Sequence, residues 1–182
     1  MKVLKKARLI LGALGLVLTM SQVSHAQLNS SVSTVNLNAP LAESLTVSAG
    51  PATVNFALIP NGSAAGSAPV SITTTWALAK TRTSVKLYAY FATTNALTDG
   101  AGDNIPAANV TGSVNGGAAA AFTGATPYTA FGMTVFTQAI GAAGTFNSSH
   151  GPDTIGLTIN TTGLNLPAAT YTGVLNIEAQ AI

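Results

Sequence analysis

A two-residue period in the pattern of apolar side chains constrains the fold of this chain more than any other feature. The period is clearest in residues 166–182 (LPAATYTGVLNIEAQAI), where small or apolar side chains alternate with polar ones from Tyr171 onward. Successive side chains of a β-strand point to opposite faces, so this segment is predicted to be a strand with one buried face. Because it reaches the end of the sequence, we expect one of its neighbours to come from far upstream or from another molecule.

The same alternation recurs through most of the sequence. It predicts strands within residues 31–49 and at 53–58, 70–78, 85–91, 108–114, 119–123, 131–140 and 155–159. The short link between the strand ending at 78 and the strand starting at 85 is predicted to be a hairpin turn. After residue 26, no segment repeats apolar residues at the three- and four-residue spacing of a helix face. About nine or ten short strands indicate an all-β fold, an immunoglobulin-like two-sheet β-sandwich.

Residues 1–26 have the pattern of a cleaved export signal. Four basic residues precede an apolar run at 9–20, and Ser24-His25-Ala26 supplies small residues at the −3 and −1 positions of a cleavage site. The apolar run is too short to span a membrane, so a membrane-spanning protein is not expected. We predict cleavage after Ala26 and a single β-sandwich domain at 27–182. The expected location is the periplasm, the cell surface or the extracellular medium.

Removal of this leader reverses the charge balance. Of the seven basic residues four lie in the leader, which leaves Lys80, Arg82 and Lys86 against five acidic residues, a net charge of −2. This balance gives no support to a nucleic-acid or anionic-membrane partner. So sparse a surface charge suits packing against other protein molecules. The sequence has no cysteine, which excludes disulfides, thiol catalysis and cysteine-bound metals.

Both ends of the predicted domain resemble spore coat protein U-like domains. The string VNLNAPLAESLTVSAGPATVNF, which ends at Phe56, and the later string VSITTTW are similar to the start of these domains. Residues 166–182 are similar to their closing strand. Such domains are subunits of archaic chaperone–usher pili and related secreted fibres. The resemblance implies a sandwich that lacks its last strand, which the amino-terminal extension of the next subunit supplies by strand addition.

The resemblance also implies roles for particular residues. Residues 27–42, here named the donor segment, are the candidate donor strand, and the closing strand is the candidate wall of the acceptor groove. The expected partners are copies of this chain or related subunits, together with a periplasmic chaperone and an usher. Whether the donor segment pairs within its own domain or with a neighbour is left open. The residues expected to take part in assembly are Val35, Leu37, Ala39, Leu41, Leu175 and Ile177.

The sequence departs from this family at its disulfide. The two cysteines that commonly join the first strand to the VSITTTW-like strand are absent, and the corresponding regions hold Leu45 and Trp76. We expect these two side chains to fill the space of the disulfide.

Two other clusters are candidates for a metal site or a catalytic site. Asp99, Asp103 and Asn104 offer oxygen ligands of the kind that calcium prefers, but the EF-hand spacing is absent, so a solvated turn is expected. His150 lies close to Asp153, but no G-x-S-x-G nucleophile motif accompanies them, so we expect a turn and no enzyme activity. No cofactor is expected.

A different function is suggested by one strand face. Lys86, Tyr88 and Tyr90 share a face of the strand at 85–91 and can form a small platform for a sugar ring. The alternative hypothesis is therefore a self-complete, monomeric sandwich that acts as an adhesin or as a carbohydrate- or surface-binding module. Aromatic residues are also common on ordinary strand surfaces.

Overall fold

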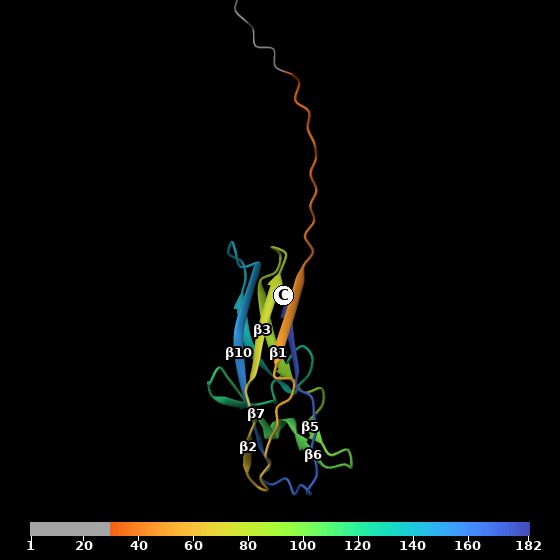
Figure 1. The fold of residues 1–182 in the computed structure, drawn as a ribbon, viewed down its shortest axis with the longest axis vertical. Helices are drawn as coiled ribbons and strands as arrows, with labels where there is room; N and C mark the ends of the chain where they lie inside the picture. The colour runs from red at the N-terminus through yellow and green to blue at the C-terminus, as the bar shows by residue number, and fades with distance from the viewer. Residues whose placement is uncertain (1–29) are drawn as a thin grey trace, which may run out of the picture. The chain divides into compact units, whose positions relative to one another are not determined.

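The protein is an all-β sandwich of two antiparallel sheets, as the sequence predicts (Figure 1). The structure, a computed structural model, describes residues 30–182. Residues 40–182 form one compact unit, and residues 30–39 form a separate segment without regular secondary structure. The predicted signal peptide and the start of the donor segment lie outside the described residues.

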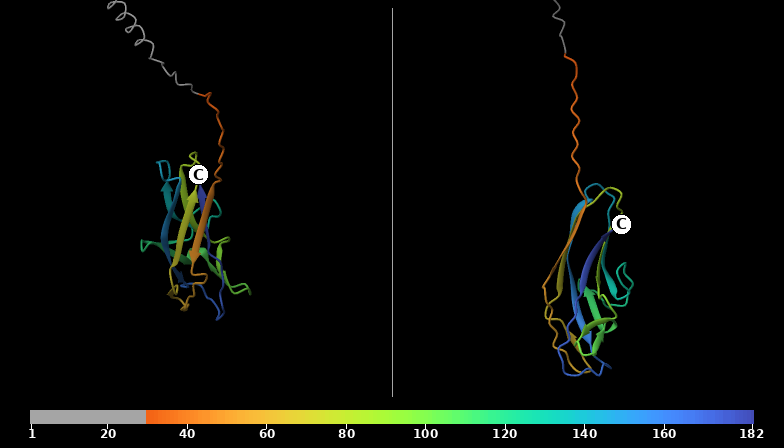
Figure 2. Two further views of the ribbon diagram at one scale, coloured as in Figure 1. Left: turned by 45° about the horizontal axis from the view of Figure 1, so that its top comes forward. Right: turned by 90° about the vertical axis from the view of Figure 1, so that its right-hand side faces the viewer.

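The first sheet contains six of the eleven strands in the described part of the chain. Its order is β1 (Ser44–Gly50), β3 (Val70–Ala77), β10 (Asn147–Asn160), β7 (Val110–Val114) and β8 (Ala119–Ala121), with β2 (Ser63–Ala65) paired to β10. The second sheet has the order β11 (Asn176–Ala181), β4 (Ser84–Tyr90) and β9 (Gly132–Ala139). A separate hairpin is formed by β5 (Asn95–Thr98) and β6 (Asn104–Pro106), and a short 3-10 helix spans Ala107–Asn109. Figure 2 shows the two layers from the side.

The alternation of the sequence places the core between the two sheets. Along β3, Val70, Ile72, Thr74 and Trp76 are buried and the residues between them are exposed. The larger of two core clusters contains the fully buried Ile72, Leu87, Val110, Phe122 and Ile155. The smaller cluster contains Trp76, Val85 and Ile140.

Leu45 and Trp76 are direct partners in the β1–β3 register. Trp76 is buried, its indole N–H donates a 2.9 Å hydrogen bond to the Thr145 carbonyl, and Leu45 packs against the same smaller cluster. Buried cross-strand pairs stabilise a sheet through the apolar area that they remove from water. Leu45 and Trp76 therefore join β1 to β3 by packing.

The predicted hairpin between residues 78 and 85 is wrong. β3 and β4 belong to different sheets, so the residues between Ala77 and Ser84 cross from one sheet to the other. The side chains on either side of this crossover, Trp76 and Val85, enter the smaller core cluster from opposite layers. Burial of both side chains in one cluster is compatible with two facing sheets, and alternation alone does not distinguish this arrangement from a hairpin.

Several strand boundaries also differ from the prediction, and the first strand begins only at Ser44, so residues 31–43 form no strand. β10 begins at Asn147, so His150 lies in a strand and the expected turn there is replaced by an irregularity of the ladder between His150 and Asp153. The alternating residues 53–58 form no strand, because their only ladder contact is the bridge between Phe56 and Gly66.

The closing strand begins at Asn176 and not at Tyr171. Before it, Thr172 forms a bridge with Thr98 of β5, with both N–H···O distances 2.9 Å. Gly173 crosses β5 so closely that an added Cβ would lie 1.9 Å from the Ala96 carbonyl oxygen. The segment that precedes β11 therefore pairs with β5 and leaves the β4 ladder.

We expect Gly173→Ala to disturb this crossing. The new methyl group has no space beside the Ala96 carbonyl, so the substitution should cost about 1–3 kcal/mol of unfolding free energy, as overpacking usually does. Amide hydrogen exchange at Thr98 and Thr172 should become faster. Gly141→Ala is the control, because nothing lies within 4 Å of its added Cβ. Unchanged exchange at both threonines would contradict the crossing.

Candidate functional site

Two strands at the same side of the sandwich each have one unpaired edge in the described part of the chain. β1 pairs only with β3, and β11 pairs only with β4. Although they belong to different sheets, β1 and β11 lie side by side (Figure 1). An unpaired edge presents N–H and C=O groups that another strand can bind. This side of the molecule can therefore accept an additional strand.

A groove of about 820 Å³, with both apolar and polar lining, lies along this side. One wall comes from residues 49–58, where Val54, Phe56 and Leu58 are half-buried. The other wall comes from residues 169–177. Core side chains reach the groove between these walls, among them Phe91, Leu157 and Ile159. The groove thus opens onto the larger core cluster of the sandwich.

The groove exists because neither wall is paired along its length. Residues 53–58 have the alternation of a strand but only the bridge between Phe56 and Gly66. Residues 171–175 pair with β5 only through Thr172. The alternation of 53–58 was the sequence signal for this wall, but the absence of a neighbouring strand has no signature in a single sequence.

The residues predicted to take part in assembly have two different environments. Leu175 and Ile177 are half-buried and line the groove. In contrast, Val35, Leu37 and Leu41 are 81%, 92% and 86% exposed, and Ala39 is exposed too. A set of large apolar side chains with this exposure typically marks an interaction segment.

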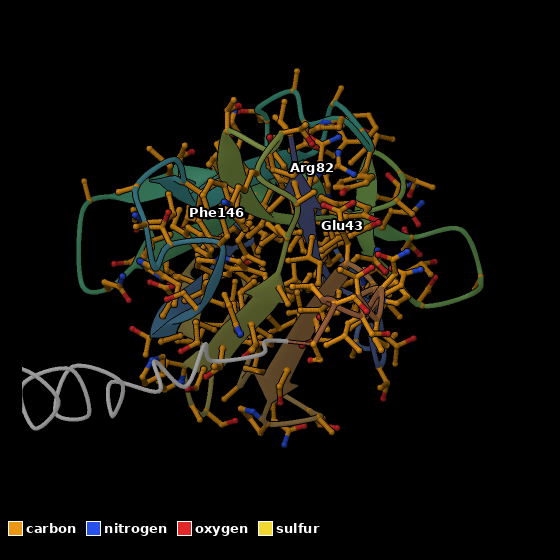
Figure 3. The ribbon with its side chains drawn as sticks, turned by 90° about the horizontal axis from the view of Figure 1, so that it is seen from above. Glu43, Arg82 and Phe146 are labelled. Carbon is orange, nitrogen blue, oxygen red and sulfur yellow. The ribbon has the colours of Figure 1, made fainter. Side chains whose placement is uncertain are left out.

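An ion pair joins the two sheets at the end where β1 begins. The Arg82 Nη2 and Nε atoms donate to the Glu43 carboxylate at 3.0 and 3.2 Å, and the Ala79 N–H donates to the same carboxylate at 2.7 Å. Arg82 Nη1 also donates to the Ala181 carbonyl of β11 at 3.4 Å. Figure 3 views this end and labels Glu43 and Arg82. The hydrogen bonds from Arg82 and Ala79 lower the pKa of Glu43, and Glu43 raises the pKa of Arg82.

Asp99 forms a closed turn between β5 and β6. Its Oδ1 atom accepts hydrogen bonds from the N–H groups of Ala101, Gly102 and Asp103 at 2.8, 3.1 and 3.0 Å. Asn104 donates to the Gly102 carbonyl at 2.7 Å. These contacts stabilise the turn itself. Within residues 30–182, no group of three or more His, Cys, Asp or Glu residues can hold a metal ion.

His150 and Asp153 lie together at the irregular part of β10. The Nδ1 atom of His150 is 2.9 Å from Oδ2 of the buried Asp153, and the imidazole stacks on Phe136 with 4.1 Å between ring centroids. Asn115 donates to the other oxygen of Asp153 at 2.9 Å. Among the described residues, no Ser or Thr hydroxyl forms a hydrogen bond to the imidazole. The cluster satisfies a buried carboxylate and connects β10 to β7.

The three residues of the predicted sugar platform lie on the outer face of the second sheet. Tyr88 is buried, because Tyr128 packs its ring against it at 5.9 Å. Tyr128 also stacks on Tyr90 at 5.2 Å, and the Tyr90 hydroxyl donates to Glu178 at 2.8 Å, which raises the pKa of Tyr90. Tyr88 therefore presents no open ring face next to Lys86.

Comparisons of the chain with protein-family models, with curated proteins and with solved structures found no match. No helix among residues 30–182 is long and apolar enough to cross a membrane.

The lowered pKa of Glu43 makes part of the stability depend on pH. Because the pKa is lower in the folded state than the ordinary 4.5, the Glu43 carboxylate stabilises the fold above that value, and this stabilisation disappears as the pH falls through the lower folded value. We expect wild type to have a higher urea midpoint than Glu43→Gln at about pH 7, and this difference to shrink as the pH falls below 4.5. Salt should reduce this difference in urea midpoint, since the Glu43 and Arg82 side chains are both exposed to solvent. A difference that stays constant over this range would contradict the assigned role of the carboxylate.

Proposed function

We propose that this protein is an exported, non-enzymatic structural subunit of a fimbria-, pilus- or coat-like assembly. In this assembly the donor segment (residues 27–42) of one copy fills the groove of another copy by strand addition. The observation that carries the proposal is a groove between residues 49–58 and residues 169–177, two segments that pair little with other strands, in a chain with an exposed, alternating apolar segment. A periplasmic chaperone and an usher, as in the family that the sequence resembles, would keep the groove occupied before assembly.

Strand addition would pair the free backbone groups at the edge of the groove and also cover its apolar side chains. The backbone of an added strand binds the free edge of β11, and its alternate side chains enter the apolar space. Val35, Leu37, Ala39 and Leu41 have the spacing required, because they lie two residues apart. Full burial of a valine or leucine side chain contributes roughly 1.5–3 kcal/mol, so burial of several such side chains offsets part of the roughly 4–15 kcal/mol that association costs.

The geometry of the compact unit supports one direction of insertion. β1 begins at the end of the sandwich that holds the Glu43–Arg82 ion pair, whereas the groove walls at 51–58 and 169–173 lie toward the opposite end (Figure 1). A segment that enters from that opposite end leads with its amino terminus and therefore runs antiparallel to β11. Such a head-to-tail contact leaves the groove of the donor copy free, and repetition gives an open filament.

One register matches a large side chain with a small one at two of its three pairs. If Leu37 lies opposite Ile177 in an antiparallel pair, Ala39 lies opposite Leu175 and Leu41 lies opposite Gly173. Alternation of large and small side chains is the usual way in which facing surfaces fill space. The cross-strand position of Leu45 and Trp76 also supports the resemblance to spore coat protein U-like domains, because these are the residues expected at the site of the family disulfide.

Cysteine cross-linking tests the proposal directly, because the sequence has no cysteine. Single-cysteine variants Val35→Cys, Leu37→Cys and Ala39→Cys are each mixed with Ile177→Cys and oxidised. We expect a disulfide-linked heterodimer with at least one of the three, since a shift of two residues keeps the same side chains inward. Thr137→Cys, exposed on the far edge strand β9, is the control and should form none.

A double variant separates the two possible sources of the inserted segment. In Leu37→Cys/Ile177→Cys, insertion from another copy gives a ladder of linked oligomers at low protein concentration. A monomer with an internal disulfide would instead show that the segment completes its own domain. Absence of a disulfide in every combination would refute strand addition.

A charge at Leu37 of the donor segment should weaken assembly. Leu37→Asp removes one buried leucine, so we expect association to weaken roughly 10- to 140-fold, measured by analytical ultracentrifugation. Asn36→Asp is the matched control, because it adds the same charge on the opposite face of the strand. Equal effects of the two substitutions would show that net charge, and not burial of Leu37, controls association.

A further inference from the structure

The groove wall at residues 53–58 has free backbone groups at every second residue. Asn55 is bonded to Ser67, which does not line the groove: the Asn55 carbonyl accepts from the Ser67 N–H at 2.8 Å, and the Asn55 N–H donates to Ser67 Oγ at 3.1 Å. Backbone groups of successive residues in an extended chain point to opposite sides, so the residues next to Asn55 direct theirs away from Ser67. Within residues 30–182, no backbone hydrogen bond is formed by Val54, Phe56 or Leu58.

The opposite wall shows the same alternation. Thr172 exchanges two hydrogen bonds with Thr98 of β5, so its neighbours direct their backbone groups away from β5. These neighbours line the groove, and in the described part of the chain they form no bond between backbone groups. They are Tyr171, Gly173 and Leu175.

The alternation continues into β11. Ile182 exchanges hydrogen bonds of 2.9 and 3.2 Å with Ser84 at the end of the β4 ladder. Every second residue before Ile182 therefore bonds to β4, and Ile177 directs its backbone groups to the other side. Each wall of the groove thus presents a row of backbone groups from the residues whose side chains line it.

The two walls run in opposite directions. Residues 53–58 are antiparallel to the segment around Gly66, which is antiparallel to β10, so they run parallel to β10 and, through β3, to β1. β1 begins where β11 ends, because Arg82 contacts both Glu43 and the Ala181 carbonyl. A strand that is antiparallel to β11 therefore runs parallel to residues 53–58.

The donor segment has backbone groups for both walls. With Leu37 opposite Ile177, its odd-numbered residues carry the inward side chains and direct their backbone groups to residues 171–177. Its even-numbered residues direct theirs to residues 53–58. In a parallel pair, one residue bonds to two residues that lie two positions apart, which is the spacing of Val54, Phe56 and Leu58. The even-numbered residues of the inserted part are Asn36, Asn38 and Pro40.

We propose that residues 53–58 are a second hydrogen-bonding wall, which becomes a β-strand when the donor segment of a second copy fills the groove. The inserted strand is then antiparallel to residues 171–177 and parallel to residues 53–58, and it joins the two sheets by one ladder. Pro40 has no N–H, so it removes a donor only on the side of residues 53–58. This inference rests on the proposed strand addition.

The test replaces single backbone N–H groups of a labelled peptide, residues 31–42, with an ester oxygen and measures binding by fluorescence anisotropy. The acceptor is the full chain with Leu37→Asp, which cannot donate its own segment efficiently. An ester at Leu37 removes a bond to residues 171–177, and an ester at Asn38 removes a bond to residues 53–58. We expect each to weaken binding roughly 2- to 13-fold, the effect of one lost hydrogen bond. An ester at Val32, which lies beyond the groove in this register, is the matched control and should leave the affinity unchanged.

Amide hydrogen exchange of the acceptor gives a second measurement that needs no modified peptide. Saturation with the unmodified peptide should slow exchange roughly tenfold or more at Val54, Phe56 and Leu58, because their N–H groups gain partners. Asn55 is the internal control, since its N–H already donates to Ser67 and should change less. Unchanged exchange at the three apolar residues would overturn the second wall.

The outcomes distinguish this inference from the function on which it rests. If the ester at Leu37 weakens binding and the ester at Asn38 matches the Val32 control, strand addition to residues 171–177 stands and the second wall is refuted. If only the ester at Asn38 weakens binding, the strand pairs with residues 53–58 alone, which overturns the two-sided ladder. If the unmodified peptide does not bind, strand addition itself is refuted, and the second wall is refuted with it.

Discussion

The unpaired edges of β1 and β11 are the constraint on which the rest of the structure depends. A buried backbone N–H or C=O without a partner costs about 1–3 kcal/mol. The backbone groups of a free edge must therefore remain hydrogen-bonded to water or pair with another strand. The sandwich combines both solutions along one side. Near Ala181 the Glu43–Arg82 ion pair joins the ends of the two edges, whereas Leu175 lines the groove together with core side chains.

The sequence predicted the local structure better than the connections. Alternation along β3 identified every buried residue of that strand, because a residue's parity decides its face. The same alternation failed at the crossover between Ala77 and Ser84, since an inward residue at each end of a link is compatible with a hairpin in one sheet and with a change of sheet. His150 was assigned to a turn because Gly151 and Pro152 follow it, whereas the structure accommodates them in an irregularity within β10.

The candidate site was predictable only in part. The alternation of the closing strand identifies Leu175 and Ile177, but the alternation of residues 53–58 predicts an ordinary strand where the structure has the opposite wall of the groove. The close approach of Gly173 to Ala96 depends on residues far apart in the chain, and no local pattern reports it. The Glu43–Arg82 pair likewise joins positions whose proximity follows from the change of sheet after β3. Long-range geometry was therefore the missing information in each case.

The packing of Leu45 on Trp76 has a consequence for how this protein is made. Two strands that are held together by a leucine and an indole need no oxidant to join them, and no reductant can part them. The fold thus depends on neither the glutathione balance of its compartment nor a thiol oxidoreductase.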